Sequence, residues 1–364
     1  MENNMTTYDL GMGELVNELM VNGGDGTSFI EGDMGSGKSA LLNMLAEKLP
    51  DFTPIYCDMV TKDVGDLAIP MFHKLEEGGN VVSFATNEEL GVHLEGKIIL
   101  LMDEFGKSSL PVQNACLRLM QERKFGPHSL HEESIVFATT NLGAENVGDL
   151  IKPHARNRVT FYRLRKATPG EFNVYMINNQ WNPAVISWVA ENPSCLQSFT
   201  QVADPKENPY IYHPKLQRNS FVTQRSLERA SKHMDKQDLR TEVALTAALI
   251  GTVGQRAGME LVAYASLIDQ LPKLQEIKDD PYSAKVPEDA AAICLVVFRV
   301  LGCIERDWMD SWMTYMNRLP KQGQTLFANQ TRVEGYARKQ IVVTHKKFQT
   351  WALDNRHLFS ADKR

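Results

Sequence analysis

The chain has 364 residues, of which 43% are hydrophobic, 23% charged and 8% aromatic. At roughly 150 residues per domain this length predicts about two domains, and the composition excludes a disordered, collagen-like or disulfide-scaffold protein. The net charge of −6 argues against a broad electrostatic surface for DNA, although it leaves a local basic patch open.

The sequence carries no membrane or secretion signal that we recognise. Its longest apolar run, Ala290 to Phe298, stops after nine residues, whereas a membrane span needs about 18. The first five residues have neither the basic start nor the apolar core of a secretory signal. The five cysteines are widely spaced without a C-x-x-C pair, which favours reduced thiols. We therefore expect a cytoplasmic protein with no membrane partner.

Short apolar runs alternate with helical patterns in the first half of the chain, which is typical of a parallel α/β sheet. The runs predict strands at 27–31, 53–57, 98–102, 135–139 and 159–163, with a helix at 110–123. Later segments predict helices within 169–191, 223–235, 240–271 and 286–316. We expect an α/β core at 1–165, an all-α region at 166–240 and a helical C-terminal region with a basic tail at 241–364.

A glycine-rich motif follows the first predicted strand. Gly32-Asp33-Met34-Gly35-Ser36-Gly37-Lys38-Ser39 matches G-x-x-x-x-G-K-[ST] and precedes a helical pattern. Glycines in such a loop let successive N–H groups point at phosphate oxygens, and the helix N-terminus adds positive dipole. We expect all eight residues to bind ATP, with Lys38 on the β- and γ-phosphates and the Ser39 hydroxyl on Mg²⁺.

Polar residues end two of the later predicted strands. Asp103 and Glu104 close the apolar run 98–102, which is a Walker B arrangement, and buried carboxylates there are costly unless a cation lies nearby. We expect Asp103 to bind Mg²⁺ together with Ser39, and Glu104 to be the base that polarises the attacking water. Asn141 follows the strand 135–139, where its uncharged amide can hold the lytic water or the γ-phosphate. Glu104 and Asn141 are therefore predicted catalytic residues.

The order and spacing of these motifs resemble those of AAA+ ATPases, and of the MoxR-type branch in particular. The stretch from Leu101 to Gly126 resembles the MoxR pattern after Walker B, and 153–159 resembles the helix end that carries an arginine finger. The segment 221–228 resembles the start of the lid helix with the sensor 2 arginine, although Gln224 stands where relatives usually have proline. The resemblance covers roughly residues 25–235 and implies a P-loop AAA+ core followed by an all-α lid.

The resemblance also implies roles for arginines and an assembly. Arg158 would be the finger that reaches the nucleotide of a neighbouring subunit, with Arg156 as the second candidate, and Arg225 would touch the phosphates of its own subunit. It further implies a ring oligomer, typically a hexamer, whose ATP hydrolysis remodels or activates a protein partner in a chaperone-like way. Proteins of the von Willebrand A type are among the partners implied.

A nucleic-acid motor, or a clamp- or helicase-loader type of AAA+ ATPase, is the alternative function. It is kept open by the segment 332–364, which has eight Lys and Arg residues against three Asp and Glu. A solvated final helix is the structural interpretation of the same segment. No Cys or His spacing typical of zinc is present, so Mg²⁺ is the one metal that we expect.

Three other segments allow both a structural and a functional interpretation. Residues 63–70 form either a surface loop or a substrate-facing insert, and 125–128 form either an ordinary turn or a pore-facing hairpin. Large apolar residues at helical spacing in the C-terminal region form either a core stripe or a partner-binding face; they are Trp308, Met309, Trp312, Met313, Tyr315 and Met316.

Overall fold

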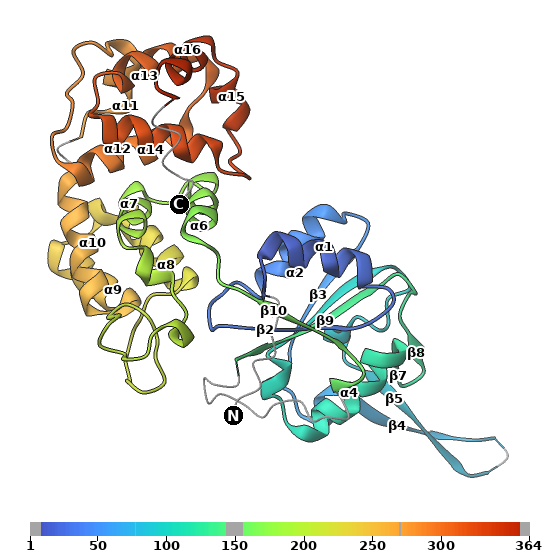
Figure 1. Ribbon diagram of the computed structural model, residues 1–364. Coiled ribbons are helices and arrows are strands. Elements are labelled where there is room, and N and C mark those ends of the chain that lie inside the picture. The colour runs from blue at the N-terminus through green and yellow to red at the C-terminus, as the bar shows by residue number, and fades with distance from the viewer. Residues whose placement is uncertain (1–8, 77, 143–155, 269–270, 357–364) are drawn as a thin grey trace. The chain divides into compact units, whose positions relative to one another are not determined.

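A computed structural model describes residues 9–76, 78–142, 156–268 and 271–356. The chain divides into two compact units, Met1–Lys166 and Ala167–Arg364, which are described separately. The first is an α/β unit and the second is all-helical in its described part, so the predicted fold class is confirmed (Figure 1). The division of the second unit into a lid at 166–240 and a C-terminal region stays a prediction.

The first unit is built on a parallel sheet with the strand order β1-β10-β2-β9-β6-β3. All five predicted strands are present, and their ends differ from the expected ones by at most two residues. β1 was not predicted, because two residues give too short a pattern. The strands are β1 (Asp9–Leu10), β2 (Ser28–Gly32), β3 (Thr53–Asp58), β6 (Ile98–Asp103), β9 (Ile135–Asn141) and β10 (Thr160–Leu164).

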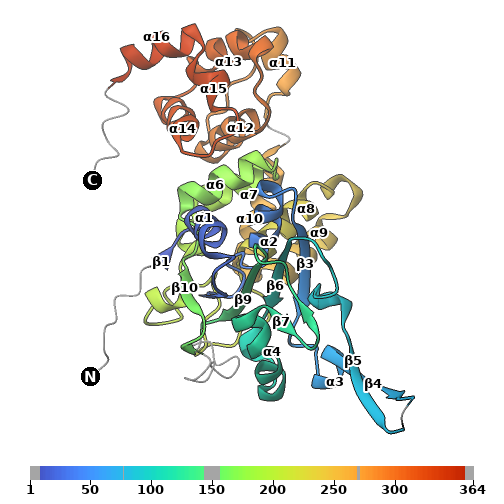
Figure 2. The ribbon, with the colours of Figure 1, turned by 90° about the vertical axis from the view of Figure 1, so that its right-hand side faces the viewer.

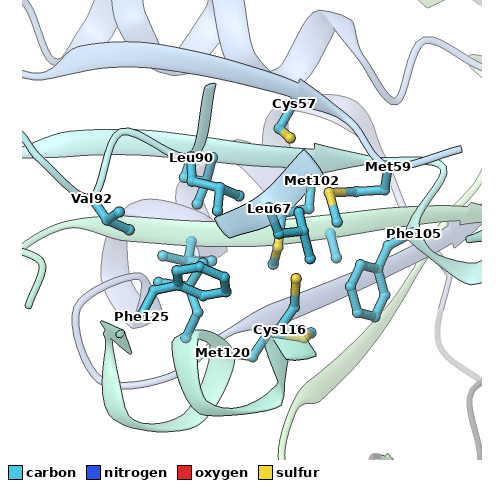
Figure 3. Packing of buried hydrophobic residues seen from close by; sticks show 14 of the residues in the cluster. Cys57, Met59, Leu67, Leu90, Val92, Met102, Phe105, Cys116, Met120 and Phe125 are labelled. Atoms are coloured by element: carbon cyan, nitrogen blue, oxygen red, sulfur yellow. The ribbon is translucent and has the colours of Figure 1, made fainter. Parts of the chain in front are cut away.

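Alternate residues of β6 enter hydrophobic clusters on opposite faces of the sheet. Leu100 and Met102 pack with α4 (Leu110–Glu122), in the cluster that Figure 3 shows around Phe105 and Cys116. Ile99 and Leu101 pack with α1 (Met12–Asn22) and α2 (Ala40–Lys48). A strand covered on both faces needs apolar residues at every position, which explains the unbroken apolar run of β6.

Two antiparallel hairpins extend the first unit. β4 (Ala68–Lys74) pairs with β5 (Asn80–Thr86), after the short helix α3 (Val64–Leu67), and the hairpin projects away from the sheet in Figures 1 and 2. The surface-loop interpretation of 63–70 is wrong, because apolar residues on both faces and a proline within the strand hide the alternation. The substrate-facing interpretation stays a prediction. A smaller hairpin joins β7 (Lys124–Phe125) to β8 (His128–Ser129), and its pore-facing role stays a prediction.

Helices make up the regular structure described for the second unit. The predicted helix over 240–271 is in fact two helices that meet at Gly254. The segments 169–191 and 286–316 each hold two α-helices joined by a longer connection. The helices are α6 (Pro169–Asn178), α7 (Pro183–Glu191), α8 (Gln224–Met234), α9 (Glu242–Val253), α10 (Gln255–Ile268), α11 (Leu274–Asp279), α12 (Ala290–Cys303), α13 (Met309–Met316), α14 (Lys321–Arg332), α15 (Lys339–Val343) and α16 (Lys346–Asp354).

Short 3-10 helices connect several of these elements. They are η1 (Glu88–Leu90), η2 (Phe105–Lys107), η4 (Pro193–Leu196), η5 (Phe199–Gln201), η6 (Gln237–Leu239) and η7 (Arg306–Trp308). The aromatic and Met residues of η7 and α13 are all buried, which confirms their interpretation as a core stripe. Among the helices that the structure describes, none combines the length and hydropathy of a membrane span.

All five cysteines are free thiols in the described part of the chain, and four of them are buried. Burial raises the pKa of the Cys57 thiol to about 11 and that of Cys116 to about 12. A thiol is nucleophilic as its thiolate, so these two cysteines are packing residues of the cluster beneath the sheet.

Gly106 gives a test of this packing. A Cβ atom added there would overlap the hydroxyl of Thr140, whereas a Cβ at Gly65 would meet nothing within 4 Å. We expect Gly106→Ala to lower the free energy of unfolding of the first unit by about 1–3 kcal/mol, and Gly65→Ala to change it little. All five tryptophans lie in the second unit, so their fluorescence monitors that unit. In urea, the circular dichroism transition of Gly106→Ala should shift while the fluorescence transition stays in place; a shift of both would contradict this assignment.

Candidate functional site

The carboxyl ends of β2, β9 and β6 meet at one edge of the sheet. Gly32 at the end of β2 lies opposite Asn141 at the end of β9, and β9 lies between β2 and β6. Asp58 and Asp103 face each other at the ends of β3 and β6. Crevices outside the carboxyl ends of parallel strands are the usual ligand sites of open α/β sheets. The strand order therefore brings the predicted loop, the predicted amide and the predicted acidic pair to one edge.

The loop Gly32–Ser39 connects β2 to α2, as the sequence predicted. Gly35 and Gly37 have positive φ angles of 71° and 91°, a region that other residues adopt at a cost, so the motif glycines are needed for this turn. Ser39 occupies the N-cap position of α2, so the positive end of the helix dipole lies at the loop. Asp33, Ser36 and Lys38 are buried in this turn.

Lys38 is the one cationic residue of the loop, and its side chain is enclosed by acceptors. Its Nζ atom donates hydrogen bonds of 2.9 Å to the backbone oxygens of Gly32 and Asp33 and to Oδ1 of Asn141. Only 6% of the residue is exposed, so these contacts offset the cost of taking its charge out of water. These three acceptors are neutral oxygens.

Asp103 accepts hydrogen bonds from three hydroxyl groups. Its Oδ2 accepts from Ser39 at 2.8 Å and from Tyr56 at 3.1 Å, and its Oδ1 accepts from Thr139. The contact with Ser39 joins the loop to β6, as expected for two ligands of one ion. Tyr56 and Thr139 were not predicted, because their approach to Asp103 depends on which strands are neighbours.

Glu104 stands in the left-handed region, with a φ angle of 55°. Its N–H donates to the Thr139 hydroxyl at 3.0 Å, and its carboxylate forms an ion pair with Lys107 in the next turn. A left-handed conformation in a residue other than glycine is uncommon and is often found at functional sites. Lys107 was not among the predicted site residues, although its spacing of three residues from Glu104 was a readable signal.

Two buried polar atoms test whether this site fits the triphosphate of ATP. Ser36 Oγ and Asn141 Nδ2 have no hydrogen-bond partner in the part of the chain that the structure describes. Leaving a buried donor without an acceptor costs about 1–3 kcal/mol. Both atoms belong to residues that line the loop around Lys38, so acceptor oxygens of a phosphate group would satisfy them. The residues present therefore fit the phosphates.

The donor set also fits Mg²⁺. Ser39 and Asp103 offer a hydroxyl and a carboxylate oxygen 2.8 Å apart, and Mg²⁺ prefers oxygen ligands, taking one or two carboxylates together with phosphates and water. Within the described ranges, no group of three or more His, Cys, Asp or Glu residues is placed to hold a metal ion. Ser39 and Asp103 would hold Mg²⁺ together with the nucleotide.

None of the hydrogen bonds described above involves a predicted arginine. Arg156 and Arg158 are exposed just before β10, where the Arg156 guanidinium lies 5.4 Å from the centre of the Phe161 ring. Pro153, His154 and Ala155 of the same motif fall outside the described residues. Arg225 is exposed in the first turn of α8, after the N-cap Thr223, in the second unit. The roles of the three arginines stay predictions.

Comparisons with known proteins give no family for the chain. No family model and no curated protein matches it. One solved structure is that of a protein from Cytophaga hutchinsonii that is provisionally named an ATPase. It is 16% identical over 88% of this chain and 81% of its own, with a TM-score of 0.34. A full-length MCM homologue from Methanopyrus kandleri is 14% identical over 69% and 53%, with a TM-score of 0.28. The match thus spans about half of that homologue, and likeness at this level supports no conclusion about function.

Replacing Lys38 tests the site directly. Lys38→Ala removes two or more charge-assisted hydrogen bonds to the phosphates, each of about 1.5–3 kcal/mol, so we expect ATP binding to weaken by roughly 100-fold or more. Lys48→Ala, at the far end of α2, is the control and should bind as the unchanged chain does. Titration with a fluorescent ATP analogue measures both variants. Tight binding retained by Lys38→Ala would refute the assignment of this loop.

Proposed function

We propose that this chain is a Mg²⁺-dependent ATPase of the AAA+ type, which hydrolyses ATP to ADP and phosphate and acts as a ring on a partner protein. The observation that carries the proposal is a pair of contacts, Lys38 to Asn141 and Ser39 to Asp103, which join the loop, β9 and β6 into one site. The buried donors of Ser36 and Asn141 support a phosphate ligand there. The motif resemblance supports the AAA+ and MoxR-like assignment.

Each residue of the site has a chemical role in this proposal. Lys38 exchanges neutral oxygens for those of the β- and γ-phosphates, which stabilises negative charge as it builds on the γ-phosphoryl group. Asn141 holds the γ-phosphate or the attacking water through its amide. Mg²⁺, held by Ser39 and Asp103, supplies charge neutralisation.

Glu104 is the proposed general base. It accepts a proton from the water whose oxygen bonds to the γ-phosphorus, while the bond from that phosphorus to the β–γ bridging oxygen breaks and ADP leaves. The Thr139 contact with the Glu104 N–H fixes the backbone of this residue beside Asp103. The Lys107 ion pair holds its carboxylate, so Lys107 is a positioning residue in this proposal.

Glu104→Gln separates binding from chemistry. The amide cannot accept the proton, so we expect turnover to fall about 10²–10⁴-fold while ATP binding is kept. Phosphate release measures turnover, and the fluorescent ATP analogue measures binding. Glu122→Gln, an exposed residue of α4 that pairs with Arg118, is the control. More than a tenth of the normal turnover in Glu104→Gln would show that another group is the base.

We propose that neighbouring subunits complete each site through Arg158. Its exposure at the surface of the first unit makes it available to a second copy of the chain. An arginine that arrives from a neighbour can stabilise the transition state without taking part in ground-state binding, and it implies a closed ring. The resemblance favours six subunits.

Arg158→Ala tests this arrangement. We expect unchanged ATP binding and a turnover lower by about 10³-fold, with Arg118→Ala as the exposed control. In the unchanged chain, turnover per subunit should rise steeply with protein concentration, because assembly brings Arg158 of one subunit to the site of the next. Normal turnover in Arg158→Ala would move the finger to Arg156 or remove it from the proposal. A mass measurement at the lowest concentration distinguishes a very tight ring from an active monomer.

A protein partner is favoured over nucleic acid. The basic segment of the C-terminal region is partly packed inward, since Phe348 and Trp351 of α16 are buried and Lys347 pairs with Asp310 at 2.8 Å. This packing supports the structural interpretation of the segment and weakens the nucleic-acid alternative. The resemblance makes a protein of the von Willebrand A type the first candidate to test as a partner.

A further inference from the structure

The carboxylate of Asp103 accepts hydrogen bonds from hydroxyl groups of three different elements. Thr139 of β9 donates to Oδ1, whereas Ser39 at the start of α2 and Tyr56 of β3 both donate to Oδ2, at 2.8 Å and 3.1 Å. An ionised carboxylate has about two acceptor positions on each oxygen. Within the described part of the chain, hydroxyl groups therefore fill Oδ2 and take one position of Oδ1.

Tyr56 differs from the other two donors in its exposure. It is 50% exposed on β3, which lies at the edge of the sheet, whereas Asp103 and Thr139 are buried. Leaving a buried polar group without a partner is costly, but a half-exposed hydroxyl can hydrogen-bond to water instead. The bond from Tyr56 to Asp103 is therefore not needed to satisfy the Tyr56 hydroxyl.

Strand pairing does not explain this bond either. β3 is joined to β6 by a parallel ladder that extends over all six residues of the strand. The ladder holds the edge strand through backbone hydrogen bonds, and the Tyr56 hydroxyl is not part of it. Ser39 and Thr139 already bind one oxygen each of the Asp103 carboxylate and orient it. Neither the sheet nor the orientation of Asp103 requires the third hydroxyl.

The number of filled acceptor positions decides how a carboxylate can bind a cation. Bidentate binding uses a position on each oxygen, whereas monodentate binding uses a position on one oxygen. Ca²⁺ takes about six to eight oxygen ligands and accepts carboxylates in either mode, whereas Mg²⁺ requires near-octahedral geometry and keeps several waters. With Oδ2 filled by two hydroxyls, Asp103 is limited to monodentate binding, which suits Mg²⁺ better than Ca²⁺.

The neighbouring aspartate, Asp58, belongs to a turn. It lies opposite Asp103 at the end of the ladder, and its Oδ1 accepts from the N–H of Val60 at 3.1 Å. The hydroxyl of Thr61 donates to the backbone oxygen of Asp58, also at 3.1 Å. Both bonds hold the turn after β3. Of these two aspartates, Asp103 is thus the one on which side-chain hydroxyls converge.

We propose that Tyr56 is a specificity-determining residue, whose hydroxyl limits Asp103 to monodentate binding and so favours Mg²⁺ over Ca²⁺. This deepens the proposed function and rests on it, because it concerns the metal of the same site. Ser39 keeps its bond to Asp103 in this arrangement, since a hydroxyl donates through its hydrogen and binds a cation through its oxygen. Without the Tyr56 hydroxyl, each oxygen of Asp103 would offer one acceptor position, as bidentate binding requires.

Tyr56→Phe removes the hydroxyl and keeps the ring. The probe is a fluorescent, non-hydrolysable ATP analogue, whose dissociation constant is measured with saturating Mg²⁺, with saturating Ca²⁺ and with EDTA. The metal preference is the dissociation constant in Ca²⁺ divided by that in Mg²⁺. We expect Tyr56→Phe to lower this ratio by about fivefold or more, through tighter binding in Ca²⁺, and to leave the value in EDTA unchanged.

Tyr162→Phe is the matched control. The Tyr162 hydroxyl lies in the same unit and also contacts a carboxylate, but its partners are Asn22 and Glu18 of α1. This variant should keep the metal preference of the unchanged chain. An equal fall of the ratio in both variants would overturn the proposal, because the effect would not depend on Asp103.

Other outcomes separate this inference from the proposed function. An unchanged ratio in Tyr56→Phe, or an equal loss of affinity in both metals, rejects the specificity role; equal loss would show that Tyr56 only orients Asp103. A ratio below one in the unchanged chain contradicts the proposal without any variant. If the unchanged chain binds the analogue in none of the three conditions, the proposed function itself fails.

Discussion

The parallel alignment of β2, β9 and β6 is the constraint on which the rest of the site depends. A slip of β9 by one residue would exchange its two faces, and it would break the contacts of Lys38 with Asn141 and of Asp103 with Thr139 together. The register is set by packing, because β6 is apolar on both sides and sends alternate residues into two different cores. The hydrophobic clusters thus place the polar residues.

Neutral groups contact both buried charges of the site. Carbonyl and amide oxygens surround Lys38, and hydroxyls surround Asp103. These contacts offset part of the cost of taking the two charges out of water.

The features that could be predicted from the sequence are those that a single short segment encodes by itself. The loop, the acidic pair and Asn141 follow strands that could be recognised from their apolar runs, and the core stripe of α13 followed from helical spacing. Tyr56 and Thr139 could not be predicted, because their contacts with Asp103 require knowing that β3 and β9 flank β6. The β4–β5 hairpin was missed because its exposed faces lack the alternation of polar and apolar residues that marks a half-buried strand.

The hairpin also has a simple attachment to the rest of the first unit. Its first and last residues, Ala68 and Thr86, are paired with each other, so the chain leaves and returns at one place. The candidate site is built from strands on either side of this excursion, and none of its residues described above comes from the hairpin. An inserted module of this kind can lengthen, shorten or change its side chains over evolution while the sheet stays the same. The residues at the carboxyl edge of the sheet could therefore be kept while this segment diverges.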